Sequence, residues 1–315
     1  MAGLPLVTGA TGFAGGHLVD HLVALAPAVA ALANPRGVAA TARHPKVAWH
    51  AVDLLDGQAV REAIAAIRPS VIYHCAGAAD VGTSWADPVT PLAVNALGTH
   101  HLLEAVRLAG STATVVLAGS ATVYRASADP LSEESPLGPS SPYGVSKLAQ
   151  EMLGAGVTSF PVILARPFNH AGPRQAPAFV TSSFARQIAE IEAGLARPEL
   201  SVGNLDARRD ITDVRDTVRA YRMLAEGGHA GRPYNICSGR AYRIGDLLEM
   251  LLARARVPIT IVSDPARLRP SDQPVILGNP SRTTTEIGWQ ARTPIEDTLK
   301  DLLEHWRLRV AAARV

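Results

Sequence analysis

The chain has 315 residues, of which 47% are hydrophobic and 18% charged, enough for one large domain or two domains that share a cleft. Its 30 basic and 28 acidic residues leave a net charge of +2, which gives no broad positive field for nucleic acid. The only cysteines, Cys75 and Cys237, lie in apolar runs and cannot form a disulfide framework, which indicates a reducing compartment.

Lysine is scarce among the basic residues. Only Lys46, Lys147 and Lys300 are lysines, so the other 27 of the 30 are arginines, and a lysine at a chemically special position is unusually informative. The N-terminus has no basic region of the signal-peptide type, and the apolar run 19–33 contains an aspartate, a histidine and a proline. We therefore expect a cytoplasmic protein that makes no membrane contact.

Short apolar runs alternate with amphipathic helical patterns in the first half of the chain. Most of the runs lack strict alternation of polar and apolar residues, as expected for strands covered by helices on both faces. The strand-like segments are 5–9, 28–33, 47–53, 70–77, 113–120 and 161–168, and the helical ones are 15–25, 57–67 and 95–110. This order predicts a doubly wound parallel α/β sheet of the Rossmann type.

The pattern changes after residue 168. Helices are predicted over 179–194, 243–255 and 294–310, a strand over 233–239, and loops over 170–178 and 201–210. We expect residues 1–168 to form a dinucleotide-binding domain to which a segment near 210–240 returns. Residues 169–209 and 241–315 are expected to form a smaller substrate-binding region.

A glycine-rich loop joins the first predicted strand to the first predicted helix. Gly9, Gly12 and Gly15 allow a tight turn and close approach of the backbone to a pyrophosphate, and the helix N-terminus supplies free N–H groups. Thr11 and Phe13 lie within the same loop. The strand–loop–helix context predicts a dinucleotide cofactor.

The end of the second strand bears on the choice of cofactor. An acidic residue there would bind the ribose hydroxyls of NAD, but this chain has Asn34 followed by Arg36, and Arg43 lies seven residues further on. We therefore favour NADP(H). If Arg36 is only a solvated loop charge, NAD(H) is the alternative.

Tyr143 and Lys147 are candidates for acid–base chemistry. Ser141 and Pro142 predict a helix start, so Tyr143 and Lys147, four residues apart, share one helix face. A phenol with a pKa of about 10 is a poor acid–base group near pH 7, and a neighbouring ammonium would lower that pKa. Lysine suits this role better than arginine, although the two residues could also be mere surface neighbours.

The G-x-x-G-x-x-G spacing, together with Ser120 at a strand end followed by Tyr143 and Lys147, resembles the extended short-chain dehydrogenase/reductase superfamily. The resemblance implies that Ser120 hydrogen-bonds the reacting oxygen beside Tyr143, and that Lys147 also binds the nicotinamide ribose. It further implies that the adenine and ribose contacts come from Asp53-Leu54 and Ala76-Gly77.

Thr122 bears on the reaction class. In nucleotide-sugar 4,6-dehydratases the residue two before the aromatic Tyr124 is an acid that removes a proton, and threonine is no base at neutral pH. Dehydration is therefore disfavoured relative to reduction or 4-epimerisation. Arg125 stands where the family usually has glycine, a departure that leaves the local loop geometry open.

The second half of the chain resembles the GDP-4-keto-6-deoxy-D-mannose reductases, which make GDP-D-rhamnose, and the related GDP-mannose 4,6-dehydratases. The resemblance lies in the runs RPFNHAGP, AFVT, GNLDARRDITDVRD, YNICSGRAYRIGDLLEMLL and RLRPSDQP. It implies that the diphosphate of a GDP-sugar is bound by Asn169, Arg209 and Arg269, and that the base lies near Phe179, Val180 and Thr181. The run SATVY, by contrast, is more similar to UDP-galactose 4-epimerases.

Together these features predict an NADP(H)-dependent oxidoreductase that reduces the 4-keto group of a GDP-6-deoxy-4-keto-hexose, without a metal. The alternative is a nucleotide-sugar 4-epimerase with bound NAD. A 4,6-dehydratase and a non-catalytic dinucleotide-binding protein are less favoured. The resemblance also implies a homodimer, formed through the helix that carries Tyr143 and the segment Asn95–Leu108.

Overall fold

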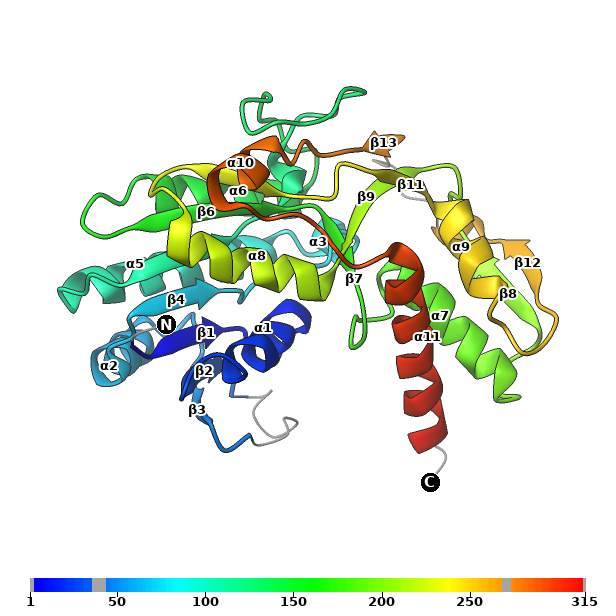
Figure 1. The fold of residues 1–315 in the computed structure, drawn as a ribbon, viewed down its shortest axis with the longest axis horizontal. Helices are drawn as coiled ribbons and strands as arrows, with labels where there is room; N and C mark the ends of the chain where they lie inside the picture. Colours follow the sequence, from blue (N-terminus) through cyan, green and yellow to red (C-terminus); the bar gives the residue numbers. More distant parts are fainter. Residues whose placement is uncertain (1–2, 36–43, 268–272, 314–315) are drawn as a thin grey trace.

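A seven-stranded parallel sheet forms the centre of the molecule (Figure 1). The computed structural model describes residues 3–35, 44–267 and 273–313. Within these residues the strand order is β10-β6-β5-β4-β1-β2-β3. The bounds are β1 Pro5–Thr8, β2 Val29–Ala33, β3 Val47–Ala51, β4 Val71–His74, β5 Thr114–Ala118, β6 Val162–Pro167 and β10 Pro233–Ile236. The predicted doubly wound sheet is confirmed.

The strand order reverses at β1, which pairs with β2 on one side and β4 on the other. In sheets of this kind ligands bind beyond the carboxyl ends of the strands next to such a reversal. Every residue of β1 and β2 is buried, which explains why their sequences lack alternation, whereas the edge strand β3 is partly exposed.

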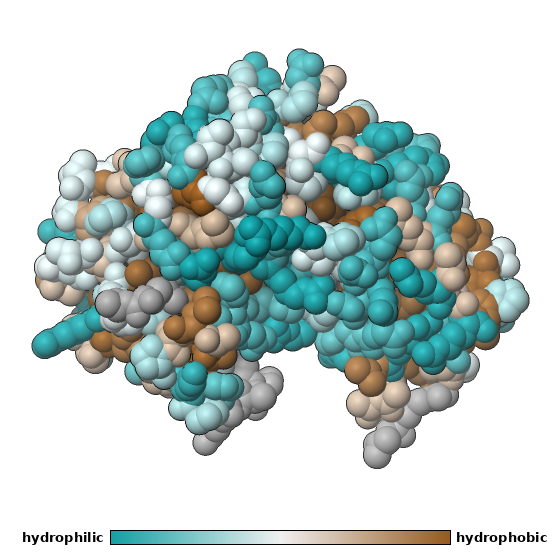
Figure 2. Space-filling model, viewed as in Figure 1, coloured by the Kyte–Doolittle hydropathy of each residue, from teal (hydrophilic) through white to brown (hydrophobic). Residues whose placement is uncertain are grey.

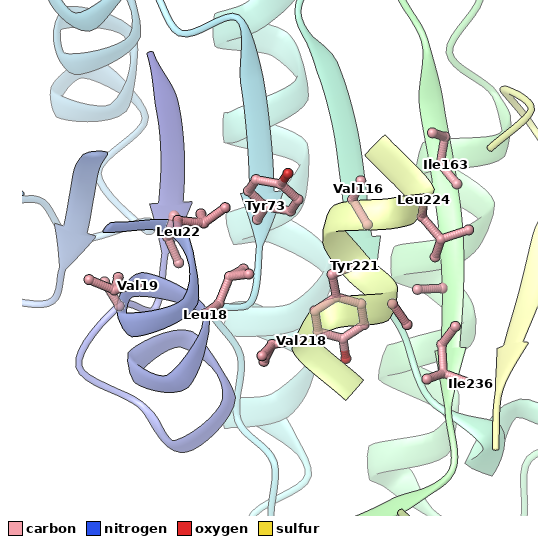
Figure 3. Packing of buried hydrophobic residues seen from close by; sticks show 14 of the residues in the cluster. Leu18, Val19, Leu22, Tyr73, Val116, Ile163, Val218, Tyr221, Leu224 and Ile236 are labelled. Carbon is pink, nitrogen blue, oxygen red and sulfur yellow. The ribbon is translucent and has the colours of Figure 1, made fainter. Parts of the chain in front are cut away.

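Helices cover both faces of this sheet. On one face, α1 (Phe13–Val23) packs beside α8 (Val214–Gly227), and Figure 3 shows their apolar side chains over β4, β5 and β6. On the other face, α2 (Gly57–Ile67) and α5 (Gly98–Leu108) form a second core, and α6 (Pro142–Ala155) contacts β6.

Several short elements surround the helices that cover this second face. They are α3 (Thr83–Ala86), α4 (Val89–Pro91), the π-helical turn η2 (Leu92–Leu97) and the 3-10 turn η3 (Ala121–Val123). The π-helical turn leads directly into α5 and packs against α6.

A smaller region with its own core lies beside the sheet, at the right of Figure 1. Its core consists of apolar side chains from α7 (Val180–Glu192), α9 (Ile244–Leu252), α11 (Ile295–Ala312) and neighbouring strands.

Figure 2 shows that hydrophilic residues cover most of one face of the sheet region and of the smaller region, and that the lower edge of the molecule is hollowed between these two regions. The remaining elements are β7 Asn169–Ala171, β8 Glu199–Val202, β9 Arg208–Asp213, β11 Ala241–Arg243, β12 Thr260–Ser263, η4 Pro265–Arg267, β13 Val275–Ile276 and α10 Ser281–Ile287.

The predicted loop over 201–210 is wrong at both ends. Residues 201–202 end β8, which pairs with β12, and residues 208–210 begin β9, which pairs with β7, β11 and β13. The charged sequence RRD hides this strand, because β9 has exposed residues at its start and buried residues from Asp210 onward. Asp210 is buried and accepts hydrogen bonds from the backbone N–H groups of Ser238 and Gly239.

Candidate active site

The glycine loop between β1 and α1 is a tight cradle. Gly9 has a φ of 63°, and a Cβ atom there would lie 2.6 Å from the backbone of Ala76. A Cβ atom on Gly15 would lie 2.1 Å from the carbonyl oxygen of Gly9. The loop therefore needs glycine at both positions, as the sequence predicts.

The N-terminus of α1 is suited to an anion. Its N-cap residue, Gly12, provides no side-chain cap, and the first turn contains no acidic residue. The first N–H groups of a helix lack partners within the helix, and the helix dipole favours negative charge at this end. Thr11 is exposed and Phe13 is half-buried beside it. These features fit the diphosphate of a dinucleotide.

The remaining predicted cofactor residues lie at the carboxyl ends of β2, β3 and β4. Asn34 directly follows β2, while Arg36 and Arg43 lie outside the described residues. Asp53 is exposed and accepts a hydrogen bond from the N–H of Leu55, and Leu54 is buried. Ala76 and Gly77 follow β4; Ala76 adjoins Gly9 of the glycine loop, and Gly77 adjoins Asn95 and Lys147.

Ser120, Tyr143 and Lys147 meet at the carboxyl end of β5. The side chain of Ser120 forms a hydrogen bond with that of Tyr143. The Nζ atom of Lys147 donates to the carbonyl oxygen of Ala118, the last residue of β5, at 2.8 Å. Lys147 also donates to the Oε1 atom of Gln150 at 2.9 Å.

The helix that carries Tyr143 and Lys147 begins as predicted. The Oγ atom of Ser141 accepts a hydrogen bond from the N–H of Gly144 at 3.1 Å, and Pro142 occupies the first helical position. A Cβ atom on Gly144 would lie 2.7 Å from the carbonyl oxygen of Thr122. This close approach brings the start of α6 against η3, next to Ser120.

Burial is the largest influence on the pKa of both Tyr143 and Lys147. It raises the pKa of Tyr143 to about 12, against a smaller opposite effect of the hydrogen bond with Ser120. It lowers the pKa of Lys147 to about 8. The expectation that the ammonium brings the phenol pKa down toward neutrality is therefore wrong for this structure. Tyr143, at 8% exposure, is instead a protonated phenol at neutral pH.

Thr122 lies directly beside Ser120. The Oγ1 atom of Thr122 donates to the Oγ atom of Ser120 at 2.9 Å, so it occupies one acceptor position of that hydroxyl. The loop that contains Arg125 is ordered by a bridge between Tyr124 and Leu137, and the N–H of Arg125 donates to the carbonyl oxygen of Pro136. Arg125 itself is exposed.

Asn95 is a site residue that the sequence analysis did not identify as one. It is fully buried in the π-helical turn, where its amide bonds both the N–H and the carbonyl oxygen of Ala78. Its Nδ2 atom also donates to the Oγ atom of Ser146, which in turn donates to the carbonyl oxygen of Tyr143. Asn95 thus joins the segment after β4 to α6. π-helical turns often mark functional sites, but they have no simple sequence signal.

The predicted substrate residues lie mostly at the edge of the smaller region. Asn169 is exposed on β7 and pairs with Ile211 of β9, two residues after Arg209. One guanidinium nitrogen of Arg209 donates to the carbonyl oxygens of Arg208 and Gln273. Arg269 lies outside the described residues.

The three residues predicted near the base begin α7. Phe179 precedes the helix and is half-buried, and Val180 is exposed. The side chain of Thr181 is buried and donates to the Oε1 atom of Gln175 at 3.3 Å. The exposed surface at this helix start therefore comes from Phe179 and Val180.

Two further properties concern the described part of the chain as a whole. No described helix has the length and apolar character needed to cross a membrane. These described residues also contain no cluster of three or more histidine, cysteine, aspartate or glutamate side chains that could hold a metal ion.

The Rossmann-like sheet, the glycine loop and the Ser120–Tyr143–Lys147 set are those of an extended short-chain dehydrogenase/reductase enzyme. Residues 6–302 match the sequence profile of the family described as GDP-mannose 4,6 dehydratase. The chain belongs to this family.

Individual relatives refine the comparison. The chain is 38% identical to the GDP-6-deoxy-D-mannose reductase of Pseudomonas aeruginosa, over 96% of this chain and 97% of the relative. It resembles the solved structure of RMD from Pseudomonas aeruginosa complexed with NADPH, with a TM-score of 0.85, 36% identity and coverage of 98% and 100%. A UDP-glucose 4-epimerase of Thermus thermophilus in complex with NAD has a TM-score of 0.84, 27% identity and coverage of 96% and 99%.

Proposed function

We propose that this enzyme uses NADPH to reduce the 4-keto group of a GDP-6-deoxy-4-keto-hexose, giving a product of the GDP-D-rhamnose type. The similarity to a GDP-6-deoxy-D-mannose reductase over nearly the whole chain supports this reaction. The single observation that carries it within the site is Thr122, which replaces the acid of the dehydratases and hydrogen-bonds Ser120.

The chain's own residues then hold the reacting oxygen and supply its proton. Tyr143, protonated because burial raises its pKa to about 12, donates its proton to the alkoxide that develops at C4. Ser120 hydrogen-bonds the same oxygen and orients it beside the phenol. Lys147 directs its ammonium toward the cofactor ribose, and its positive charge stabilises the phenolate that forms when Tyr143 loses its proton. NADPH, when bound, supplies the hydride.

The proposed cofactor site uses the residues that form the cradle. The diphosphate would be held by Gly9, Thr11, Gly12, Phe13 and Gly15. The adenosine half would be held by Asp53, Leu54, Ala76 and Gly77. Asn34 and Arg36 in place of an acid favour the 2′-phosphate of NADP(H) over NAD(H). The relative that was solved with NADPH supports this preference.

For the substrate we propose that Asn169, Arg209 and Arg269 bind the diphosphate and that Phe179, Val180 and Thr181 lie near the base. Asn169 and Arg209 are close in register on neighbouring strands, which supports a shared site. Binding of GDP, UDP and dTDP to the purified protein, compared by calorimetry, tests the nucleotide. We expect GDP to bind most tightly, and a preference for UDP would contradict the GDP-sugar assignment.

Consumption of NADPH in the presence of the GDP-4-keto-6-deoxy sugar, followed by absorbance, tests the reaction. Tyr143→Phe removes only the hydroxyl, so turnover should fall by roughly 10²–10⁴-fold, while NADPH binding persists. Full activity of the Phe variant would refute the role of Tyr143, and no NADPH consumption by the wild type would refute the reductase.

A 4-epimerase is the second candidate, and the NAD complex of the Thermus thermophilus epimerase favours it. Such an enzyme would retain NAD through purification and interconvert UDP-hexoses without net consumption of cofactor. Nucleotide analysis of the denatured protein and incubation with UDP-glucose separate the two candidates.

We also propose the domain division predicted from the sequence, in which residues 1–168 and a returning segment near 210–240 bind the cofactor. Residues 169–209 and 241–315 would form the substrate-binding region. The separate apolar core of α7, α9 and α11 supports this division, as does the place of β10 in the large sheet.

A cytoplasmic location is proposed because the thiol of Cys237 is buried and forms no disulfide.

A homodimer is proposed through α6 and the segment Asn95–Leu108, which includes α5. Exposed apolar side chains lie on both, with Met152 67% and Leu108 54% exposed. The others are Leu97, Val145 and Leu153. Light scattering of Met152→Glu should show monomers where the wild type is a dimer, and an unchanged mass would contradict this interface.

A further inference from the structure

Gln150 is a buried side chain that the mechanism above does not use. It lies on α6, three residues after Lys147, and is 0% exposed. Its Oε1 atom accepts a hydrogen bond from the Nζ atom of Lys147 at 2.9 Å. We propose that Gln150 is a positioning residue that holds the ammonium of Lys147 charged and correctly aimed. This inference rests on the role proposed for Lys147.

The orientation of the Gln150 amide is determined by Lys147. An amide that presented its NH₂ group to the ammonium would oppose donor to donor, so the oxygen must face Nζ. The NH₂ group then points away from Lys147. Within the described residues, Nε2 of Gln150 is buried and has no hydrogen-bond partner. The narrow space around the side chain is lined by Leu117, Gly119, Leu164 and Ala165, together with Glu151, whose carboxylate is paired with Arg166.

This arrangement is unfavourable for stability taken alone. A buried donor without a partner carries the cost of its desolvation, whereas an apolar side chain of the same length would carry none. Gln175 provides the contrast, because it is also buried but both ends of its amide are bonded, to His170 and Thr181. The unbonded amide of Gln150 therefore points to a role at Lys147 that an apolar residue could not fill.

Gln150 completes a two-point attachment of the ammonium. Lys147 has three N–H donors, of which one is held by the carbonyl oxygen of Ala118 and one by Gln150. These two hydrogen bonds fix the direction of the third N–H group. Both acceptors are neutral, so they stabilise the charged amine in a buried place without cancelling its charge.

The titratable groups that face Lys147 supply no competing negative charge. Burial lowers the pKa of His74 to about 3 and raises the pKa of Cys75 to about 12, so both are neutral near pH 7. Tyr143, on the same helix, is a protonated phenol. Glu151 is held by Arg166 at 2.5 Å. The Gln150 amide is therefore the side-chain acceptor that opposes deprotonation of Lys147 among these neighbours.

The test uses Gln150→Met and Gln150→Glu, with Gln175→Met as the matched control for loss of a buried glutamine. At pH 9.5, where the buried Lys147 is mostly deprotonated, Gln150→Met should unfold at an equal or higher temperature than the wild type, whereas Gln175→Met should unfold at a lower one. In Gln150→Met the alkaline limb of the kcat/KM profile should move down by about one pH unit, because the ammonium loses an acceptor. Gln150→Glu should move the same limb up.

A second readout needs no substrate. The rise in stability that accompanies deprotonation of Lys147 should begin at a lower pH in Gln150→Met than in the wild type. If Gln150→Met destabilises like Gln175→Met and leaves both pH dependences unchanged, Gln150 is a packing residue and the proposal fails. If the wild type lacks reductase activity but the unfolding profile shifts as expected, the proposed function fails and the positioning role stands.

Discussion

Lys147 carries a charge that destabilises the fold, and replacing it by methionine tests this directly. The side chain is 6% exposed, and burial lowers its pKa from 10.5 to about 8. At neutral pH this shift corresponds to a charged amine that lowers the folding stability by about 3 kcal/mol. Methionine has a similar length and no charge.

The sign of the pH dependence follows from the lowered pKa. Between pH 8 and 10.5 the unfolded protein binds this proton more strongly than the folded protein, so wild-type stability rises with pH. From pH 7 to 9.5 the contribution of Lys147 should increase by about 2 kcal/mol. Lys147→Met lacks this contribution, and the hydrogen bonds lost at Ala118 and Gln150 add a difference that is independent of pH.

Urea unfolding of both proteins at pH 7 and 9.5 measures this difference. Lys300→Met, which replaces an exposed lysine of α11, serves as the control and should follow the wild-type pH dependence. The stability of Lys147→Met relative to the wild type should fall by about 2 kcal/mol between the two pH values. Parallel pH dependences in all three proteins would refute the argument.

Two further substitutions test the cradle and the core behind the site. Gly15→Ala places a Cβ atom 2.1 Å from the Gly9 carbonyl oxygen, so NADPH affinity measured by fluorescence should fall at least tenfold, with a loss of about 1–3 kcal/mol in stability. Glu151→Gln removes the partner of the buried Arg166 and should cost about 3–5 kcal/mol in urea unfolding. The double replacement Glu151→Leu, Arg166→Met should cost less, because no buried charge remains unpaired.

The large sheet was predictable because its signals are local. Uninterrupted apolar runs mark strands covered on both faces, and alternating helical patterns mark the crossovers between them. The glycine loop and the start of α6 were equally readable, since Gly9, Gly15, Ser141 and Pro142 act on the backbone within a few residues. These local rules sufficed for the fold class and for the positions of Tyr143 and Lys147.

The features that the sequence did not reveal depend on contacts between distant segments. Asn95 acquires its role from Ser146, 51 residues away, and from a π-helical turn without a distinct pattern. The start of β9 was predicted as a loop because its pairing partners lie on three separate segments. The pKa of Tyr143 was predicted in the wrong direction because burial, which no local pattern reports, outweighs the effect of its neighbours.

The return of the chain to the large sheet at β10 has a consequence for synthesis on the ribosome. β10 pairs with β6, yet part of the smaller region, including α7, β8 and β9, lies between these two strands in the chain. Until residue 236 has emerged, β6 is an edge strand whose backbone groups could pair with another nascent chain. A truncation after residue 168 would leave that edge permanently uncovered, so such a fragment should aggregate rather than behave as a free-standing module.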